Sequence, residues 1–453
     1  MKPKQARESA SPARQRAYDI LLRVETERAY ASPLIASLAD SDVSREDRAL
    51  TQEIVLGVLR SRLALDYFIA RYCARPIQKM DPPVLIALRI GLYQLRFLSG
   101  VPKSAAVNES VKLVKQMGAA SAASLVNAVL RKATRHPDET AGDSISDPIE
   151  RASVELSHPR WMLERWQASL GADECRHLAI ANNTVPATAF RVNTLCASSE
   201  QVLSDLGTKG VIVRPSGVAP DAYVVEARPV RPVIEAAREG LIYIQDEASQ
   251  LVSLLLEPRS EHRMLDLCAA PGSKASHIAT LTSDQAWIVA CDVHPHRLRV
   301  LREICKRLGL HSVDPIALDA TESAPFIESA QAFDRVLLDA PCSGTGTLRS
   351  NPEIKWRLSA FDLTTLAELQ FKLLERAAAE VAEDGRLVYS TCSIEREENE
   401  EVVKRFLQSN AAFRVVQPHA RAELITSEGF VRTYPHKHGC DGFFAAVLER
   451  KDK

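Results

Sequence analysis

From about residue 241 to the end of the chain, short runs typical of strands alternate with longer stretches typical of helices. The strand-like runs are RMLDLCA, AWIVACDV, PIALDA, FDRVLLDA, GRLVYSTCS and GFFAAVLER. The helical stretches are KASHIATL, HPHRLRVLREICKRLG, TTLAELQFKLLERAAAEVA and REENEEVVKRFLQ. This alternation predicts a Rossmann-like α/β domain, in which helices cover both faces of a parallel sheet. Ligands of such sheets bind beyond the carboxyl ends of the strands, so we expect the chemistry there.

Residues 14–136 carry apolar side chains at helical spacing and show no strand pattern. Five segments show this spacing, and prolines stand between them: ARQRAYDILLRVE, REDRALTQEIVLGVLRSRLALDYFIARY, PPVLIALRIGLYQLRFL, AAVNESVKLVKQM and ASLVNAVLRKATR. We therefore expect an all-α bundle over residues 1–140.

A polar segment with proline and glycine, PDETAGDSISDPIE (137–150), predicts a linker after the bundle. Beyond it, PRWMLERWQASLG and SSEQVLSDLG are typical of helices, whereas ATAFRVNTL, GVIVRPS and AYVVEA are typical of short strands. The chain is thus expected to be multidomain, with the helical bundle (1–140), a small α+β module (150–240) and the α/β domain (241–453).

The formal net charge of −1 conceals an asymmetry along the chain. Residues 1–140 hold 22 Lys and Arg against 14 Asp and Glu, whereas the remainder holds 35 against 44. A basic module joined to an acidic one suggests that the first meets a polyanion such as nucleic acid. A solvated surface with a chance imbalance would give the same counts.

Composition excludes several classes of protein. No apolar run approaches the roughly 18 residues of a membrane span, and the N-terminus MKPKQARESASPARQ lacks the apolar stretch of a secretory signal. The nine cysteines are odd in number and follow no framework of paired spacings. We expect a monomeric cytoplasmic protein without membrane contact.

The first strand-like run leads into DLCAAPGSKASHI (266–278), where a turn of small residues precedes a helix that begins near Ser273 or Lys274. Such a turn aims free backbone N–H groups and the positive end of the helix at a ligand. The small side chains of Ala269, Ala270 and Gly272 allow the ligand to approach the backbone closely.

The next run ends at Asp292, twenty residues after Gly272. An acidic residue at that distance binds the ribose hydroxyls of a nucleoside cofactor, although it can also cap the following helix. The turn is neither GxxxxGK[ST] nor GxGxxG, which argues against a phosphate chain. S-adenosyl-L-methionine is the nucleoside cofactor that fits, with Asp319 after the third run accepting a hydrogen bond from the adenine amino group.

The fourth and fifth runs end in LLDAPCSGTG (337–346) and LVYSTCS (387–393), which places Cys342 and Cys392 at neighbouring strand ends. A thiolate that adds to carbon 6 of cytosine makes carbon 5 able to take a methyl group. A base then removes the carbon 5 proton and the thiolate leaves. Lys274 is a candidate for the positive charge that such a thiol needs. A lone cysteine is more often buried core than nucleophile, and the strand pattern does not rank the two thiols.

A metal site is the alternative at HKHGC (436–440), where His436, His438 and Cys440 lie close together. Zinc sites usually use four ligands at standard spacing, and no second ligand pair occurs in the chain. We expect no metal there and expect Cys440 to pack before the last strand.

The segments CAAPGSK, DAPCSGTG, YSTCS and CDGFFAAVLER resemble the RNA cytosine-5 methyltransferases of the NOL1/NOP2/Sun family. DRALTQEIVLGVLR, LRIGLYQLRFL, AAVNESVKL and VNAVLR resemble the NusB-like RNA-binding domain of one branch of that family, so the likeness extends from about residue 14 to 450. It implies methylation of a cytosine in 16S ribosomal RNA, at the position conventionally numbered 967. The substrate would be naked RNA or a small-subunit assembly intermediate.

The resemblance also implies roles for single residues. Cys392 would be the nucleophile and Cys342 would release the product. Asp292 would contact the ribose and Asp319 the adenine, with Asp339 between cofactor and target base. The cofactor would be lined by Cys268, Ala269, Ala270, Pro271, Gly272, Ser273 and Lys274. The segment RSNPEIKWR (349–357) resembles one that approaches the substrate.

Ser273 departs from the family, which usually has a second glycine there. Serine would be strained if this position had φ > 0, but serine also suits the start of a helix. The catalytic motifs fit transfer RNA as an alternative substrate. A non-catalytic RNA-binding or assembly factor is less favoured because both cysteines and the acidic residues are present. DNA methylation is disfavoured because no separate target-recognition domain follows the cysteines.

Overall fold

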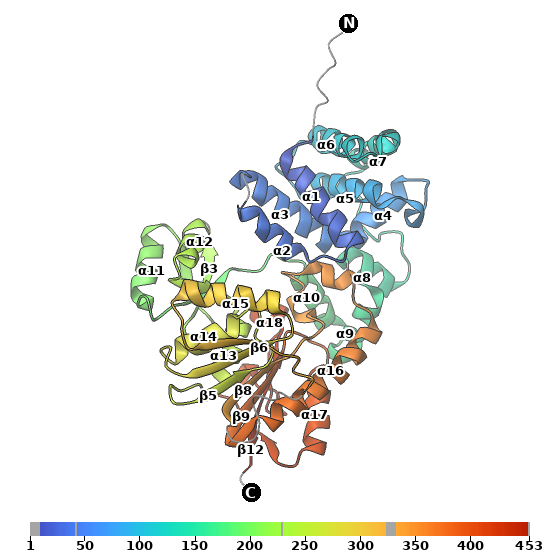
Figure 1. Cartoon of the computed structure of the whole chain (residues 1–453). Coiled ribbons are helices and arrows are strands. Elements are labelled where there is room, and N and C mark those ends of the chain that lie inside the picture. Colours follow the sequence, from blue (N-terminus) through green and yellow to red (C-terminus); the bar gives the residue numbers. More distant parts are fainter. Residues whose placement is uncertain (1–9, 41–42, 228–229, 323–331, 452–453) are drawn as a thin grey trace. The chain divides into compact units, whose positions relative to one another are not determined.

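The computed structural model describes residues 10–40, 43–227, 230–322 and 332–451, and Figure 1 traces the whole chain. The first nine residues, which belong to the N-terminal segment judged to lack a signal, lie outside the described ranges. The chain divides into two units. The first unit comprises Met1–Thr184 and Leu348–Leu358, and the second comprises Val185–Thr347 and Ser359–Lys453.

The described part of the first unit is helical, as the apolar spacing predicted. Its α-helices are α1 (Pro12–Thr26), α2 (Ala31–Ala36), α3 (Arg45–Arg60), α4 (Arg62–Tyr72), α5 (Pro82–Phe97), α6 (Lys103–Gln116), α7 (Ala123–Arg135), α8 (Pro148–Leu156), α9 (Arg160–Leu170) and α10 (Ala172–Asn182). Prolines open α1, α5 and α8, where the missing N–H would have no partner in any case. Every residue of α5 from Val84 to Gln94 is buried, so this helix forms the centre of the bundle.

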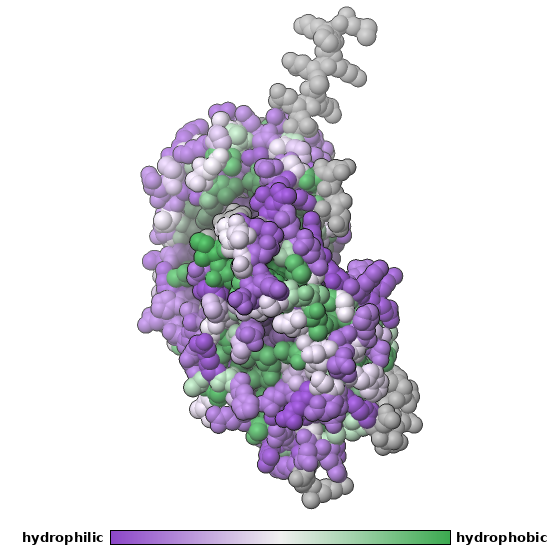
Figure 2. All heavy atoms as spheres, turned by 90° about the vertical axis from the view of Figure 1, so that its left-hand side faces the viewer, coloured by the Kyte–Doolittle hydropathy of each residue, from purple (hydrophilic) through white to green (hydrophobic). Residues whose placement is uncertain are grey.

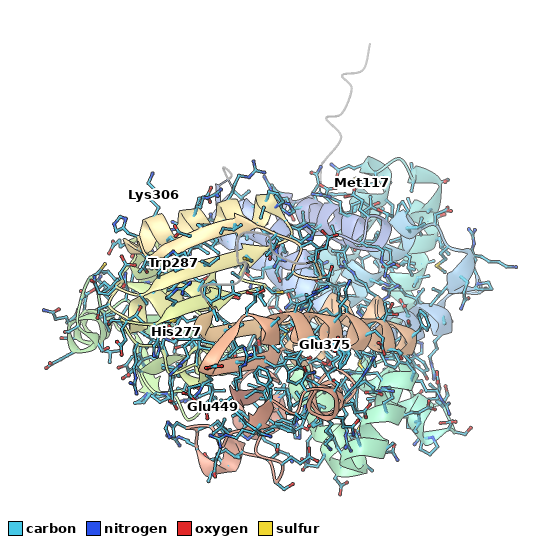
Figure 3. All side chains as sticks on the ribbon, turned by 60° about the horizontal axis from the view of Figure 1, so that its bottom comes forward. Met117, His277, Trp287, Lys306, Glu375 and Glu449 are labelled. Carbon is cyan, nitrogen blue, oxygen red and sulfur yellow. The ribbon has the colours of Figure 1, made fainter. Side chains whose placement is uncertain are left out.

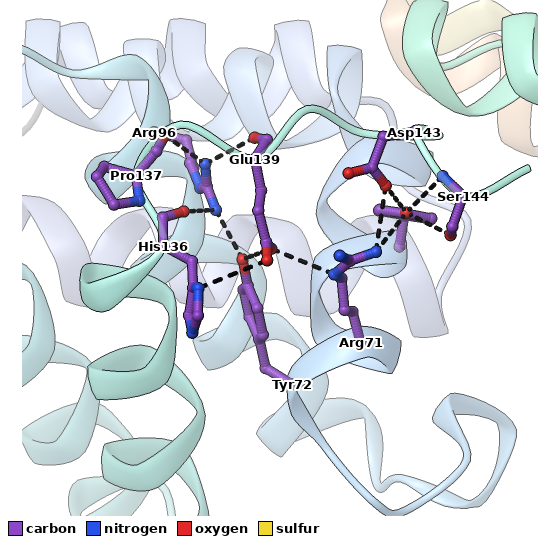
Figure 4. A network of polar contacts seen from close by, with 9 residues as sticks. Arg71, Tyr72, Arg96, His136, Pro137, Glu139, Asp143 and Ser144 are labelled. Atoms are coloured by element: carbon purple, nitrogen blue, oxygen red, sulfur yellow. Dashed lines mark hydrogen bonds and ion pairs between the residues drawn. The ribbon is translucent and has the colours of Figure 1, made fainter.

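The segment predicted to be a linker, 137–150, is held to α4 and α5 by polar contacts (Figure 4). Arg96 donates to the carbonyl oxygens of Pro137 at 2.7 Å and Glu139 at 2.9 Å. Arg71 pairs with the carboxylates of Glu139 at 3.3 Å and Asp143 at 3.1 Å. These contacts fix the path of the segment before Asp147 caps α8.

The second unit begins with a four-stranded antiparallel sheet of order β2-β3-β1-β4. Its strands are β1 (Ala189–Val192), β2 (Ile212–Pro215), β3 (Ala222–Ala227) and β4 (Ile242–Ile244). The helices α11 (Ser199–Thr208) and α12 (Arg231–Arg238) share one apolar cluster with Phe190 and Ile242 of this sheet. The sheet therefore includes β4, which lies beyond residue 240.

The larger sheet of the second unit has the order β10-β12-β9-β8-β5-β6-β7, and β11 pairs with β12. Its strands are β5 (Arg263–Asp266), β6 (Trp287–Asp292), β7 (Val313–Ala317), β8 (Phe333–Asp339), β9 (Val381–Thr391), β10 (Phe413–Val415), β11 (Val431–Arg432) and β12 (Phe444–Arg450). Its helices are α13 (Glu247–Leu255), α14 (Ser273–Leu281), α15 (Pro295–Leu308), α16 (Ala360–Ala379), α17 (Glu400–Ser409) and α18 (Pro435–His438). Figure 3 shows their side chains, with Trp287 at the start of β6 and Glu449 near the end of β12.

Helices cover both faces of this sheet, as predicted. One apolar cluster joins the sheet to α13, α14 and α15 through Leu251, Ile278 and Leu301. A second cluster joins the other face to α16 and α17 through Leu374 and Phe406. Strands β5 to β9 are parallel, so their carboxyl ends meet at one edge.

The prediction of an all-parallel sheet is wrong for the last strand. β12 runs antiparallel to β9 and lies between β9 and β10. Parallel neighbours need a crossover of about a dozen residues or more. The connection from β11 to β12 holds only the short helix α18, Pro435–His438, so β12 runs antiparallel to β11.

No helix in the described ranges is long and apolar enough to cross a membrane. On the face shown in Figure 2, hydrophilic side chains predominate and apolar ones gather in separate patches.

Candidate active site

The cofactor turn lies between β5 and α14. Gly272 is the N-cap of α14 with φ of 113°, a backbone conformation that residues with a side chain rarely adopt. A Cβ atom there would lie 2.8 Å from Cγ of Leu301 on α15, so the turn packs too closely for any side chain. Ser273 is the first helical residue and is not at positive φ, so the departure from the family introduces no strain. The N-cap is Gly272, and the helix begins at Ser273, as expected from the sequence.

Asp292 ends β6 beside this turn. Its Oδ1 accepts from the backbone N–H of His294 at 2.8 Å, and its Oδ2 lies 3.4 Å from the Arg297 guanidinium. Arg297 also donates to the carbonyl oxygen of Ala270 at 2.7 Å, which links the carboxylate to the turn. Asp319 follows the adjacent strand β7, is exposed, and accepts hydrogen bonds from the N–H and hydroxyl of Thr321.

At the carboxyl edge, the buried side chain of Lys274 forms an ion pair with Asp339, which is partly exposed. The Nζ of Lys274 lies 2.6 Å from Oδ2 of Asp339, and the Ser390 hydroxyl donates to Oδ1 of Asp339 at 2.8 Å. Burial opposes the charge of Lys274, but the charge and hydrogen bond of Asp339 outweigh it and raise the pKa of the ammonium. The charge of Cys392 contributes in the same direction, which sets that thiol near the ammonium.

The two cysteines at the strand ends meet. The Sγ atoms of Cys342 and Cys392 lie 3.3 Å apart, and both residues are partly buried. Asp339 and Ser390 are register partners on β8 and β9, so the two loops leave the sheet side by side. The hydrogen bond to Cys392, followed by burial, raises the pKa of the Cys342 thiol well above its ordinary value. Either sulfur can act as the S–H donor in this contact.

Two groups at the base of the turn are shielded from water. Burial, followed by the charge of Asp339, raises the pKa of the Asp266 carboxyl to about 7. No side chain in the described ranges donates a hydrogen bond to it. Burial also raises the pKa of the Cys268 thiol well above its ordinary value.

Sequence reasoning missed Glu398 and Asn399. The run EREENEE was expected to be part of a helix, but α17 begins at Glu400 and these two side chains are buried before it. Glu398 accepts from Ser343 and Ser393, the residues that follow the two cysteines. The one available signal was the position of this run directly after the second cysteine.

The segment 349–357, expected to approach the substrate, belongs to the first unit. Lys355 is fully buried, and its Nζ donates to the carbonyl oxygens of Arg60 at 3.1 Å and Ser157 at 2.8 Å and to the amide oxygen of Asn183 at 3.1 Å. The indole N–H of Trp356 donates to the carbonyl oxygen of Leu59 at 2.8 Å. The helices of the first unit thus hold this segment.

The cluster at 436–440 is not arranged as a metal site. Nδ1 of His438 accepts from the backbone N–H of Tyr434 at 2.9 Å, and Cys440 is buried in the core before β12. In the part of the chain that the structure describes, no group of three or more His, Cys, Asp or Glu could hold a metal ion.

Comparison with known families gives three matches along the chain. The model described as 16S rRNA methyltransferase RsmB/F matches residues 253–449. The NusB family model matches residues 11–135, and the ferredoxin-like domain of RsmF/B-like methyltransferases matches residues 158–231. The last match includes β1 to β3 of the small sheet.

Curated relatives span almost the whole chain. The "Probable ribosomal RNA small subunit methyltransferase B" of Bacillus subtilis (strain 168) is 34% identical over 447 residues, covering 96% of this chain and 98% of that protein. The "Ribosomal RNA small subunit methyltransferase B" of Pseudomonas putida is 36% identical over 416 residues, covering 90% of this chain and 91% of that protein.

A solved structure titled "Crystal Structure of PH0851" matches at 29% identity with a TM-score of 0.84, covering 98% of this chain and 100% of that chain. The resemblance drawn from the sequence motifs is confirmed: the chain belongs to the RsmB/F family of 16S ribosomal RNA methyltransferases and carries a NusB-type N-terminal domain.

Proposed function

We propose that this chain transfers a methyl group from S-adenosyl-L-methionine to carbon 5 of a cytosine in 16S ribosomal RNA, of the position-967 class. The observation that carries the proposal is the pair of thiols, whose sulfur atoms lie 3.3 Å apart. The cofactor turn and the Lys274–Asp339 pair lie at the same edge of the sheet. Covalent attack by a thiolate is one of the ways to activate this otherwise unreactive carbon.

The residues around the turn fit S-adenosyl-L-methionine. Gly272 caps the start of α14 at positive φ, where the free backbone N–H groups of the helix can bind a ligand. Asp266, Asp292 and Asp339 place acidic groups near one another there, and the charges of Asp339 and Asp292 both raise the pKa of Asp266. This acidic surrounding suits a cofactor that carries a sulfonium and an ammonium group. Asp292 would hold the ribose, Asp319 the adenine, and residues 268–274 the remainder.

Cys392 is the proposed nucleophile because its charge interacts with the Lys274 ammonium, and because the S–H of Cys342 can donate to it. Both contacts stabilise a thiolate. Its sulfur forms a bond to carbon 6 of the cytosine, and the electron pair of the 5,6 double bond becomes available at carbon 5. S-adenosyl-L-methionine supplies the electrophilic methyl group. A base then takes the carbon 5 proton, the double bond reforms, and the carbon–sulfur bond breaks to return Cys392 as thiolate.

Cys342 is the proposed release residue. Its sulfur lies 3.3 Å from the Cys392 sulfur, so its S–H can donate there and would stabilise that sulfur when it leaves the base. Without this donor the departing thiolate is less stable, so the adduct persists. The family resemblance favours attack by Cys392 and release by Cys342, rather than the reverse.

The RNA would be bound by the NusB-type bundle within residues 1–140 and the small module within 150–240, in a monomer of the cytoplasm. The bundle segment holds 22 Lys and Arg against 14 Asp and Glu, which favours contact with phosphates. The target base would leave its stack to reach the thiol. The substrate would be 16S RNA or a small-subunit assembly intermediate.

Bisulfite sequencing of ribosomal RNA from a strain that lacks this gene tests the proposal. We expect one cytosine of 16S RNA to lose its modification and to regain it when the gene returns. Loss of a transfer RNA modification instead, or of none, would refute the proposed substrate.

A further inference from the structure

Glu398 lies behind the two cysteine loops with its side chain fully buried. Its Oε1 accepts from the Ser343 backbone N–H at 2.8 Å and from the Gln370 amide at 2.9 Å. Its Oε2 accepts from the hydroxyls of Ser343 and Ser393, both at 2.5 Å. An ionised carboxylate has about four acceptor positions, and four donors occupy them here.

These contacts act on the cysteines through their neighbours. Ser343 follows Cys342, and Ser393 follows Cys392, so one carboxylate joins the two loops that present the thiols. Asn399, the next residue, accepts from the Thr391 hydroxyl at 2.5 Å and donates to the carbonyl oxygen of Ser393 at 2.8 Å. The nucleophile loop is thus fixed on both sides of Cys392.

The charge of Glu398 also affects the two thiols unequally. After the hydrogen bond to Cys392 and burial, the charge of Glu398 is one of the causes that raise the pKa of Cys342. The charge of Lys274, in contrast, interacts with that of Cys392. A negative charge that acts on Cys342 and a positive charge that acts on Cys392 favour one proton arrangement over its reverse.

We propose that Glu398 is a positioning residue for methyl transfer, which holds the two thiol loops in register and keeps the negative charge on Cys392 rather than on Cys342. The inference rests on the proposed covalent mechanism and adds to it the group that sets the thiol pair. A carboxylate that only stabilised the fold would not change the pH dependence of methyl transfer.

Two substitutions test separately whether Glu398 acts by positioning the loops or by its charge. Glu398→Gln preserves the shape, because an amide can donate to the two serine hydroxyls while its oxygen still accepts from Ser343 and Gln370. We expect the Gln variant to turn over substrate near neutral pH. The alkaline limb of its pH–rate profile should move to lower pH by about one unit, because Cys342 loses its proton more readily. Glu398→Ala removes the bridge, and a displacement of about 1 Å between reacting groups lowers kcat by about 100-fold.

Glu400→Gln is the matched control, because Glu400 lies two residues away and pairs with Arg432 at 2.5 Å instead of with the serines. It should lower the melting temperature without moving the pH profile. Equilibrium binding of S-adenosyl-L-methionine should stay within about twofold in all three variants, since none lines the turn.

The outcomes are distinct. An unmoved alkaline limb in Glu398→Gln would overturn the inference about charge, and an unchanged kcat in a folded Glu398→Ala would overturn the inference about position. If Glu398→Ala does not fold, the Gln variant still decides between the two roles of the carboxylate. If the native protein methylates RNA without any cysteine adduct, the proposed mechanism fails by itself, whatever the Glu398 variants show.

Discussion

The Sγ atoms of Cys342 and Cys392 lie 3.3 Å apart at the ends of two adjacent parallel strands. Residues 50 positions apart in the sequence therefore bring their sulfur atoms into contact. Because the two thiols have different surroundings, their removal should have different consequences. The charge of Cys392 interacts with the Lys274 ammonium, whereas Cys342 is subject to the charges of Glu398 and Asp339.

Cys392→Ala should abolish methyl transfer, with a loss of at least about 10³-fold in kcat, because no other group replaces a covalent nucleophile. Binding of S-adenosyl-L-methionine should stay within about twofold, since Cys392 lies on the loop after β9 and not in the cofactor turn. Single-turnover transfer of labelled methyl groups and calorimetric binding measure the two properties. A variant with near-normal turnover would exclude Cys392 as nucleophile.

Cys342→Ala should trap the protein on its RNA. Attack by Cys392 is retained, but the departing sulfur loses its hydrogen-bond donor and leaves slowly. A denaturing gel of enzyme incubated with RNA and S-adenosyl-L-methionine should show a slower, RNA-dependent band. The double variant Cys342→Ala/Cys392→Ala is the control and should give no such band. Absence of the band in the single variant would remove Cys342 from product release.

Gly272→Ala should weaken the cofactor site. The residue has φ of 113°, and an added Cβ would lie 2.8 Å from Leu301. Backbone strain of this kind costs about 1–3 kcal/mol, and the turn must shift as well. We expect binding of S-adenosyl-L-methionine to fall at least about tenfold.

Gly309→Ala separates strain from cofactor contact. Gly309 at the end of α15 also has positive φ, of 71°, but an added Cβ would meet nothing within 4 Å. This variant should lose stability in a urea titration while its cofactor affinity stays unchanged. Equal loss of affinity in both glycine variants would show that the turn has no special role.

The strand ends and the two thiols were predictable from the sequence because their signals are local. A short β-rich run followed by a small-residue turn or a cysteine places its last residues at the sheet edge whatever the rest of the chain does. The antiparallel return of β12 was not predictable in this way, because it depends on the shortness of α18. The same holds for the pairing of Cys342 with Cys392, which needs the order β9-β8-β5.

Glu398 and Lys355 show where sequence reasoning fails. Both are charged side chains in polar segments, which usually lie in solvent. Each is buried because its partners come from distant parts of the chain: Ser343, 55 residues before Glu398, and Arg60, 295 residues before Lys355. No local pattern carries that information, so the serine–carboxylate network of the site appears only once the fold is known.

Asp266 should make the stability of the protein depend on pH. Burial and the charge of Asp339 raise the pKa of this carboxyl to about 7 in the folded state, whereas in the unfolded chain it ionises near its ordinary value of 3.8. Between these two values the folded state holds one proton more than the unfolded state. The free energy of unfolding therefore falls as pH rises, by about 1.4 kcal/mol for each unit and by as much as about 4 kcal/mol in total.

Asp266→Asn isolates this effect, because the amide has no proton to lose. Urea titrations of both proteins at pH 4 and pH 8 give two differences in unfolding free energy, and other titrating groups cancel between the proteins. The unfolding free energy of the variant, relative to that of the native protein, should increase as pH rises. Only the native protein must place a charge in the buried site above about pH 7. An equal difference at both pH values would mean that Asp266 is ionised throughout. Its charge would then be balanced within the fold, and the acidic surrounding that supports a cationic cofactor would be weaker than proposed.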